Sequence, residues 1–335
     1  MVALYVTSLE KGSGKTTVCA GLGKRLLNEG KKVGFFKPVI SGGKNNSTRA
    51  DSDAKFIKGL FSLDESADIL SPVISSRGSL AGSIKETCGK VSQNKDVVII
   101  EGVSDQYWAS SEITEALDAR VIVVEPYSHE LLKVVENTKI IGKSLLGVVL
   151  NKVPITRMEQ ARTEASTRLD KAKVNLLGVL PEDRILLTLS IGELAERIQG
   201  KILCGAEQSS ELVENLMLGA LALDPGPNYF GRKDNKAVVL KSERSDMQMA
   251  ALETSSRCLV LTGDTPPNPA VLDRAEKKKV PIILAKDDVT ALVANIEDAL
   301  VNSRFNQENK LSKLSDIMGQ HLDFQTVYEG LGLAA

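Results

Sequence analysis

Short apolar runs alternate with segments of helical spacing along the first part of the chain. The apolar runs predict buried strands at 3–8, 32–39, 96–102, 119–126 and 145–153. After the first run, Val18, Leu22 and Leu26 recur at helical spacing, and a glycine ends the segment. A further helix is expected at roughly 129–142. Strand, helix and strand repeated in this way predict a parallel sheet covered by helices on both faces.

The alternation starts again near residue 204. A helix is expected at 209–222, and the turn cluster "DPGPN" follows it. Three further strands are expected at 236–242, 258–264 and 280–288, with helices between them. We therefore predict two α/β domains, residues 1–204 and a smaller one over 205–335. Parallel strands share one direction, so the loops after the three later strands should gather at one sheet edge.

The stretch "YVTSLEKGSGKTT" at 5–17 joins the first predicted strand to the first predicted helix. It ends as a phosphate-binding loop of pattern G-x-x-x-x-G-K-[ST] should, but Leu9 stands where that pattern has its first glycine. The loop must therefore turn differently at its start. Lys11 lies four residues before Lys15, and we expect it to be solvated or to steer anions.

Backbone N–H groups near the two glycines of this loop can form an anion nest, and the helix N-terminus adds its dipole. Lys15 would reach the β- and γ-phosphates of a nucleotide, and the Thr16 hydroxyl would bind Mg²⁺. The alternative is a solvated turn, which the strand-loop-helix context disfavours. The predicted nucleotide-binding residues of the loop are Gly12, Ser13, Gly14, Lys15, Thr16 and Thr17.

Magnesium also needs carboxylates. Glu101 ends the apolar run "DVVIIEG", which places it at the sheet edge where ligands bind in such folds. Asp51 and Asp53 lie just before a predicted helix, where either could instead be an N-cap and nothing more. We take Thr16, Asp53 and Glu101 as the candidate metal ligands.

Two more polar residues follow predicted strands. Lys37 ends the strand of "FFKPVISGG" and would face the same edge, where it suits an anionic substrate or a γ-phosphate. Asn151 in "LNKV" can offer a donor and an acceptor to an adenine edge, or it can be a simple turn residue. Lys15 and Lys37 are therefore the candidate catalytic lysines.

Composition narrows the function classes. The chain has 335 residues, a net charge of −1 and a pI of about 6.3, so no basic excess argues for a nucleic-acid or membrane surface. No apolar run approaches the roughly 20 residues of a membrane span. The four cysteines form no C-x-x-C pair, which is typical of free thiols in a reducing cytoplasm. With two histidines, a histidine-based metal site is not expected.

The segments "KGSGKTT", "FKPVISGG", "DSDA", "VVIIEG" and "GVVLNKV" occur in the order seen in dethiobiotin synthetase-like ATP-binding proteins. The resemblance covers about residues 1–200 and implies a P-loop NTPase-type fold with ATP and Mg²⁺ as cofactors. It implies phosphate binding by the loop and Lys15, and Mg²⁺ at the three ligands named above. Lys37 and Ser41 would lie beside the substrate and the γ-phosphate, and Asn151 beside the base.

Residues 241–288 resemble the DRTGG domain, which follows such an ATP-binding domain in the N-terminal half of some long phosphate acetyltransferases. The resemblance implies a regulatory half standing alone, and acetyl transfer is not expected because the chain ends at Ala335. Two segments depart from the families. "EGVSDQYW" replaces a glycine-rich continuation, and Ser242-Glu243-Arg244 replaces Gly-Asp-Arg.

Two function classes remain open. One is a nucleotide sensor, in which the second domain transmits the ATP state to a partner or to a second copy in a homodimer. The other is an enzyme, either a weak ATPase or an ATP-dependent ligase that carboxylates or amidates a small carboxylate substrate, as dethiobiotin or cobyrinate synthases do. A built-in glutaminase is not expected, because His321 has no evident tie to Cys258.

Overall fold

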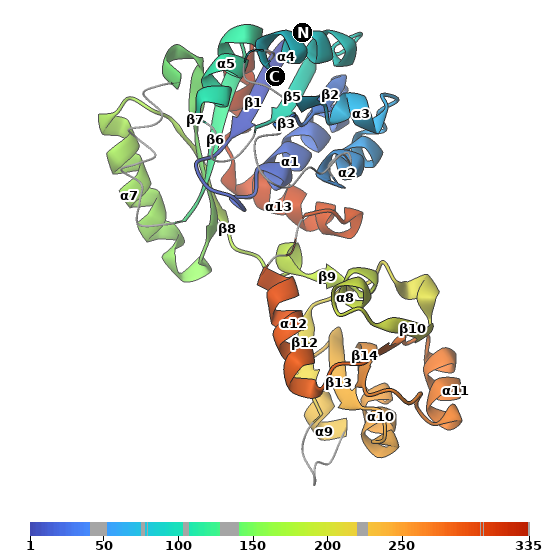
Figure 1. The fold of residues 1–335 in the computed structure, drawn as a ribbon. Helices are drawn as coiled ribbons and strands as arrows, with labels where there is room; N and C mark the ends of the chain where they lie inside the picture. The colour runs from blue at the N-terminus through green and yellow to red at the C-terminus, as the bar shows by residue number, and fades with distance from the viewer. Residues whose placement is uncertain are drawn as a thin grey trace. The chain divides into compact units, whose positions relative to one another are not determined.

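A computed structural model describes the chain over residues 1–40, 52–74, 78, 80–102, 107–127, 141–219, 227–301, 303 and 305–333. The chain forms two compact units. The first unit comprises Met1–Asp183 together with Lys310–Ala335, and the second comprises Arg184–Asn309. Each unit is an α/β layer structure with its own sheet, which confirms the predicted fold class (Figure 1).

The first unit is built on a parallel sheet with the strand order β2-β5-β1-β6-β7-β8. Its central strands are buried along nearly their whole length, as expected for strands covered on both faces. All five strands that the sequence predicts in this part are present. With β8, the sheet has six strands, which are β1 (Val2–Thr7), β2 (Val33–Phe36), β5 (Val97–Glu101), β6 (Arg120–Pro126), β7 (Leu145–Val153) and β8 (Leu176–Pro181).

Helices lie on both sides of this sheet (Figure 1). Helix α1 contacts β1, β2 and β5 directly, and a short two-stranded pair of β3 (Val39–Ile40) and β4 (Val73–Ile74) follows β2. The expected helix at 129–142 lies mostly outside the described residues. The helices of the first part are α1 (Lys15–Asn28), α2 (Ser52–Phe61), α3 (Ala67–Leu70), α4 (Leu80–Val91), α5 (Tyr107–Leu117) and α7 (Met158–Lys171).

The second unit has a sheet of strand order β10-β15-β14-β13-β12. Strands β12 to β15 are parallel, and the edge strand β10 is antiparallel to β15. The three strands predicted here, β13 to β15, are adjacent, so the loops after them leave from one edge, as expected. The strands are β10 (Lys201–Cys204), β12 (Asn215–Leu218), β13 (Lys236–Lys241), β14 (Ser256–Thr262) and β15 (Ile282–Ala285), and the helices are α8 (Ile191–Arg197), α9 (Pro227–Phe230), α10 (Ser245–Leu252), α11 (Pro269–Lys278) and α12 (Val289–Val301).

The helix predicted at 209–222 is wrong over the residues that the structure describes. Residues 212–213 form β11, which pairs antiparallel with β9 (Leu189–Ser190), and β12 pairs with β13. The apolar spacing of this segment fits a helix, but its backbone hydrogen-bonds to an open sheet edge instead. Pairing with a distant strand therefore overrides the local pattern, as strand formation often does.

The two units also differ from the division predicted at residue 204. Residues 184–204 belong to the second unit, because β10 pairs with β15 and α8 packs against α12. The chain then returns, and Lys310–Ala335 belongs to the first unit. Helix α13 (Leu311–His321) packs on α1 and β8, and α14 (Phe324–Leu331) packs on β7 and β8.

The contact between α13 and α1 is close. Met318 on α13 is buried, and its sulfur would lie 1.9 Å from a Cβ added at Gly21 on α1. A glycine in mid-helix costs stability, so its presence here indicates that the close approach of the two helices offsets that cost. Arg25 of α1 also lies over the ring of Phe324 on α14. The C-terminal helices are therefore packed directly behind the helix that starts at the phosphate-binding loop.

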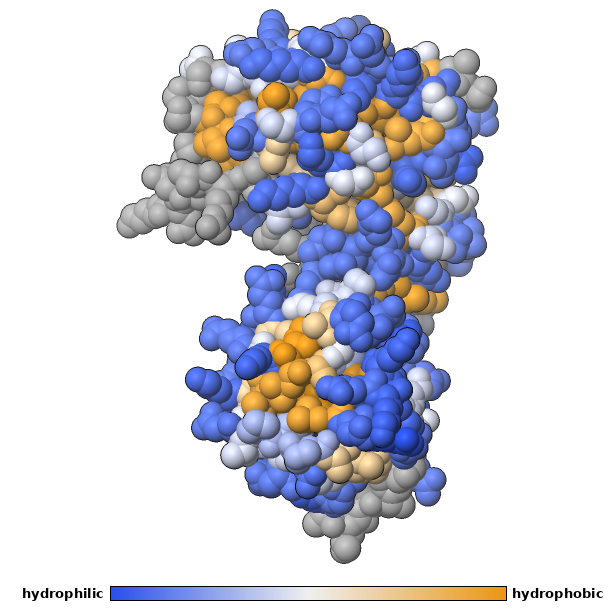
Figure 2. Space-filling view, turned by 90° about the vertical axis from the view of Figure 1, so that its right-hand side faces the viewer, coloured by the Kyte–Doolittle hydropathy of each residue, from blue (hydrophilic) through white to orange (hydrophobic). Residues whose placement is uncertain are grey.

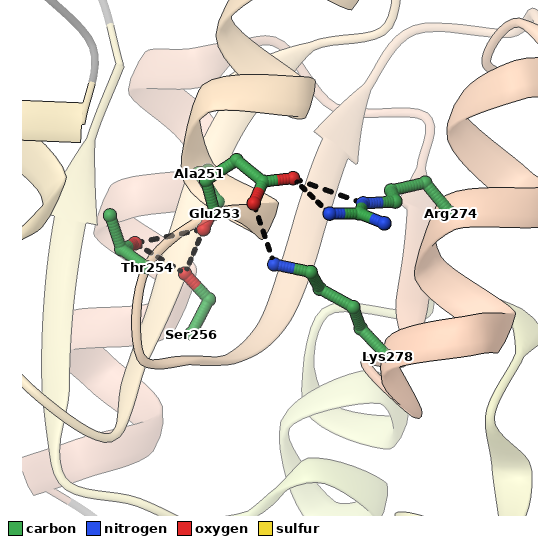
Figure 3. Close-up of polar contacts among 6 residues, drawn as sticks. All are labelled: Ala251, Glu253, Thr254, Ser256, Arg274 and Lys278. Carbon is green, nitrogen blue, oxygen red and sulfur yellow. Dashed lines mark hydrogen bonds and ion pairs between the residues drawn. The ribbon is translucent and has the colours of Figure 1, made fainter.

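Surface ion pairs tie the elements of the second unit together. The Glu253 carboxylate accepts from Arg274 at 2.7 Å and from Lys278 at 2.9 Å, which links the end of α10 to α11 (Figure 3). Thr254 and Ser256 donate their hydroxyls to the Ala251 carbonyl and close the end of the helix. Exposed pairs of this kind contribute little individually. Figure 2 shows an apolar area on this unit, surrounded by polar residues, on the side where β10 and α11 lie in Figure 1.

Two features agree with the composition. Cys19, Cys88, Cys204 and Cys258 are all free thiols. Within the part of the chain that the structure describes, no helix combines the length and the apolar character that a bilayer crossing requires.

We predict that Met318→Ala destabilises the first unit by about 2–5 kcal/mol, because it leaves a cavity against Gly21. Trp108, the single tryptophan, lies in α5 of this unit, so its fluorescence is followed during urea unfolding. Ser315→Ala, at an exposed position of the same helix, is the control and should change stability by less than about 0.5 kcal/mol. An unchanged Trp108 transition in Met318→Ala would show that α13 does not support this unit.

Candidate functional site

The candidate site lies at the edge of the first sheet where its parallel strands end. Neighbouring strands deliver one functional residue or segment each to this edge, because all of them run in the same direction. From one side to the other, these are Lys37 after β2, Glu101 at the end of β5, the phosphate-binding loop after β1, Glu125 in β6 and Asn151 in β7.

The loop after β1 has the backbone of an anion nest. Gly12 and Gly14 adopt positive φ angles of 71° and 95°, which side chains rarely tolerate. Helix α1 begins directly after Gly14, and the Val18 N–H bonds the Gly14 carbonyl at 3.0 Å. Lys15, Thr16 and Thr17 are thus the first three residues of the helix. The arrangement presents N–H groups and a helix N-terminus in one place, as anion binding requires.

Asn151 holds the end of this loop. Its side-chain Nδ2 donates to the Ser13 carbonyl at 2.8 Å, and a Cβ added at Gly14 would lie 2.1 Å from the same nitrogen. Asn151 and Ser13 are both buried, and the Ser13 hydroxyl has no hydrogen-bond partner among the described residues. The sequence predicted a place beside a nucleotide base for Asn151. The structure adds a contact that the sequence did not predict, with the loop backbone.

Lys15 is buried at the start of α1. Its Nζ donates to the Ser8 hydroxyl at 2.9 Å, and Ser8 in turn donates to the Glu10 carbonyl at 2.6 Å. Burial lowers the pKa of Lys15, and the nearby Glu101 carboxylate opposes this shift. The ammonium therefore lies against the inner side of the loop, where it can approach a bound phosphate.

Thr16, Asp53, Glu101 and Lys37 converge beside the loop. The Thr16 hydroxyl lies 2.8 Å from Glu101 Oε1 and 3.5 Å from Asp53 Oδ2. The Lys37 ammonium pairs with Glu101 Oε1 at 3.0 Å and also with Asp53 Oδ2. Burial raises the pKa of Glu101, and the positive charge of Lys37 opposes that rise. Four residues from separate segments of the chain thus share one charged cluster.

The cluster fits a hard divalent cation. It offers two carboxylates and a hydroxyl, which are the oxygen ligands that Mg²⁺ prefers. The Glu101 Oε2 atom is buried and has no hydrogen-bond partner among the described residues, so one carboxylate oxygen remains to be satisfied. Across all of the residues that the structure describes, no group of three or more His, Cys, Asp or Glu side chains is suited to hold a metal ion. A Mg²⁺ ion here would therefore need Thr16, water and phosphate oxygens as further ligands.

Glu125 is a residue that the sequence analysis missed. It is buried, and its Oε1 accepts a hydrogen bond from the backbone N–H of Leu9, the residue that replaces the first glycine of the loop. Burial raises its pKa to about 7. The signal was present, because "VIVVEP" places an acid at the end of a buried strand just as "VVIIEG" places Glu101.

Some predicted site residues lie outside the described residues. These are Ser41, Asp51 and the segment 103–106 that departs from the glycine-rich pattern. Lys11 is exposed, as expected.

Two family matches divide the chain near the boundary between its units. Residues 2–188 match the family described as "AAA domain", and residues 193–299 match the family described as "DRTGG domain". The architecture is therefore a P-loop domain of dethiobiotin synthetase-like type followed by a DRTGG domain, as the sequence segments indicated.

The relatives fall into two groups. A phosphate acetyltransferase of Nitrosomonas europaea is 23% identical over 96% of this chain and 50% of its own length. An ATP-dependent dethiobiotin synthetase of Caldicellulosiruptor saccharolyticus is 27% identical over 55% of this chain and 88% of its own length. The chain thus spans about half the length of the phosphate acetyltransferase.

Solved structures match the chain over about half its length. A nucleotide-binding protein of Archaeoglobus fulgidus in complex with ADP overlaps with a TM-score of 0.39 and 21% identity, covering 54% of this chain and 82% of its own. The MinC:MinD cell division protein complex of Aquifex aeolicus also gives a TM-score of 0.39, at 17% identity, covering 56% of this chain and 84% of the matched chain.

We predict that Gly14→Ala destabilises the first unit by more than Gly12→Ala. In both variants, alanine is held at a positive φ, which costs about 1–2 kcal/mol of stability. Only the Cβ at position 14 also clashes with Asn151, since a Cβ at Gly12 has nothing within 4 Å. Urea unfolding followed by Trp108 fluorescence measures both. Adding Asn151→Ala should recover part of the Gly14→Ala loss, a coupling of about 0.5–3 kcal/mol. Fully additive effects would mean that the loop and Asn151 are not in contact.

Proposed function

Because the chain belongs to the family described as "AAA domain" and continues into a DRTGG domain, we propose that it is a Mg-ATP-binding protein whose second unit serves regulation or assembly. The observation that carries this proposal is the cluster of Thr16, Asp53, Glu101 and Lys37 beside a loop of nest conformation. A nest with a buried lysine favours phosphate, and the carboxylate pair favours a divalent cation.

In this proposal, the backbone of the loop holds the phosphates, and Lys15 neutralises their charge. The loop residues concerned are Gly12, Ser13, Gly14, Lys15, Thr16 and Thr17. Bound Mg²⁺ would neutralise phosphate charge, held by Thr16, Asp53 and Glu101. Asn151 keeps its loop contact through Nδ2, which leaves its Oδ1 to accept from a base. Ser41 completes the proposed set beside the γ-phosphate.

The regulatory reading rests on the alignment with phosphate acetyltransferase, which runs over both units and 96% of the chain. A second copy of this chain is the proposed partner. The edge strand β10 leaves one side of its backbone without a strand partner among the described residues, and the apolar area in Figure 2 lies on the same unit. A cytoplasmic setting is also part of the proposal, and the four free thiols support it.

A second candidate function is an ATP-dependent ligase acting on a small carboxylate. Lys37 favours it, because its ammonium lies between two carboxylates at the metal cluster, where it could neutralise a substrate carboxylate or a phosphoryl group. The identity with dethiobiotin synthetase over the first unit supports the same reading. In this reaction the residues of the chain would orient the two reactants. The γ-phosphoryl group would pass from ATP to the substrate oxygen with ADP as the leaving group, and the attacking amine or ammonia would then displace phosphate.

We predict that the protein binds Mg-ATP and that Lys15→Ala weakens binding by at least ~2 kcal/mol, about 30-fold, since a charge-assisted hydrogen bond to phosphate is lost. Isothermal titration calorimetry measures this directly. Lys55→Ala, an exposed lysine on α2, is the matched control and should bind as the wild type does. Chelation of Mg²⁺ should also weaken binding. Equal affinities for the wild type and Lys15→Ala would contradict the nucleotide assignment.

The two candidate functions give opposite results in a turnover assay. As a sensor, the protein should release ADP slowly whatever small molecule is added, and its mass by light scattering should change when Mg-ATP is added. The assay panel contains biotin-pathway amines, each supplied with bicarbonate, and small carboxylates, each supplied with ammonia. As a ligase, the protein should release ADP at least about tenfold faster with one of these substrates than without any. Lys37→Ala should abolish that stimulation and Lys37→Arg should retain part of it. Stimulation that survives Lys37→Ala would exclude Lys37 from the reaction.

A further inference from the structure

The phosphate-binding loop opens without the glycine that its pattern has at position 9. Leu9 occupies this position and does not take a positive φ, so the chain turns here with an ordinary backbone conformation. Its N–H then needs a hydrogen-bond partner, because a backbone donor held in a folded loop is rarely left unpaired. The carboxylate of Glu125 supplies that partner.

Glu125 reaches the loop from the neighbouring strand. In the register of β1 and β6, Thr7 pairs with Val123, so Glu125 lies two residues further along β6, just as Leu9 lies two residues beyond Thr7. Glu125 is only 3% exposed. This carboxylate is therefore positioned by β6 and contacts the first residues of the loop that follows β1.

A second strand fixes the other end of the loop. Asn151 on β7 donates to the Ser13 carbonyl, and the register pairs Glu125 with Leu150 and Pro126 with Asn151. Two side chains from adjacent strands on one flank thus hold the start and the end of the loop. Glu101 and Lys37 lie on the opposite flank, at the end of β5 and just after β2.

We propose that Glu125 is a positioning residue of the nucleotide site, whose carboxylate fixes the opening of the phosphate-binding loop in place of the missing glycine. The inference rests on the proposed nucleotide-binding function, but it concerns a contact present without nucleotide. It assigns a role to a buried acid that is not among the proposed magnesium ligands.

The charge state of Glu125 should control how firmly the loop is held. Among the described residues, Glu10 and Lys15 are the charged groups that act on it, with opposite signs, and burial raises its pKa to about 7. Above pH 7 the ionised carboxylate accepts the Leu9 N–H more strongly, and below pH 7 the protonated group holds it less firmly. A folded-state pKa above the unfolded value of about 4.3 means that ionisation costs stability as the pH rises through 7. The contact is retained despite that cost.

The test compares Glu125→Ala, which removes the acceptor, with Glu125→Gln, which keeps an acceptor but cannot ionise. Hydrogen exchange of the peptide containing Leu9 should be faster in Glu125→Ala and near the wild-type rate in Glu125→Gln at pH 7. After correction for intrinsic exchange, the wild type should be better protected at pH 8 than at pH 6, and Glu125→Gln should lack this difference. Mg-ATP affinity should fall about tenfold in Glu125→Ala and recover in Glu125→Gln.

The readouts separate the two possible failures. If Lys15→Ala and the wild type bind Mg-ATP equally poorly, the proposed function fails, while the exchange data still decide whether Glu125 holds the loop. If Glu125→Ala exchanges and binds as the wild type does, the positioning role is overturned. If both Glu125 variants lose protection equally and the wild type gains no protection between pH 6 and pH 8, neither the acceptor nor the charge of Glu125 holds the loop, and the inference is also overturned. Trp108 fluorescence confirms in each case that the first unit is folded.

Discussion

A buried carboxylate that must be neutralised organises the first unit. Glu101 ends the interior strand β5, and burial disfavours its charge. Lys37 from the neighbouring strand end and the Thr16 hydroxyl from α1 compensate for that cost. Removing one partner of such a cluster leaves an uncompensated charge in the interior. Compensation of the buried Glu101 charge therefore requires the helix after the loop and the ends of two strands to keep their positions relative to one another.

The same cluster leaves some requirements unmet. Glu101 Oε2 and the Ser13 hydroxyl are both buried without hydrogen-bond partners among the described residues. Ser13 lies in the loop before α1, and Glu101 contacts Thr16 in the first turn of α1. Native proteins leave few such atoms, and those that remain often mark places where an ion, water or ligand belongs. The Glu101 oxygen can accept a cation, and the Ser13 hydroxyl can donate to an anion. The pair therefore suits a metal ion bound together with a phosphate group.

The sequence predicted the first sheet well because its strands are buried on both faces and so appear as nearly continuous apolar runs. Glu101 and Lys37 were found for the same reason, since each follows such a run directly. Glu125 follows one too, but its role depends on the register between β6 and β1, which no local pattern shows. β12 was predicted as helix because its spacing suits both structures until the edge of β13 is known. The return of α13 to α1 likewise depends on packing between segments far apart in sequence.

The return of the chain makes the second unit an insertion within the first. The chain leaves the first unit after Asp183 and re-enters it at Lys310, so both ends of the insert are anchored, one beyond β8 and the other just before α13. A protease that cuts one loop of the insert would not release it, because each resulting fragment keeps a part of the first unit. Any change in the distance between the ends of the insert would displace the first unit at two points, after β8 and before α13. A single flexible linker could not transmit a displacement in this way.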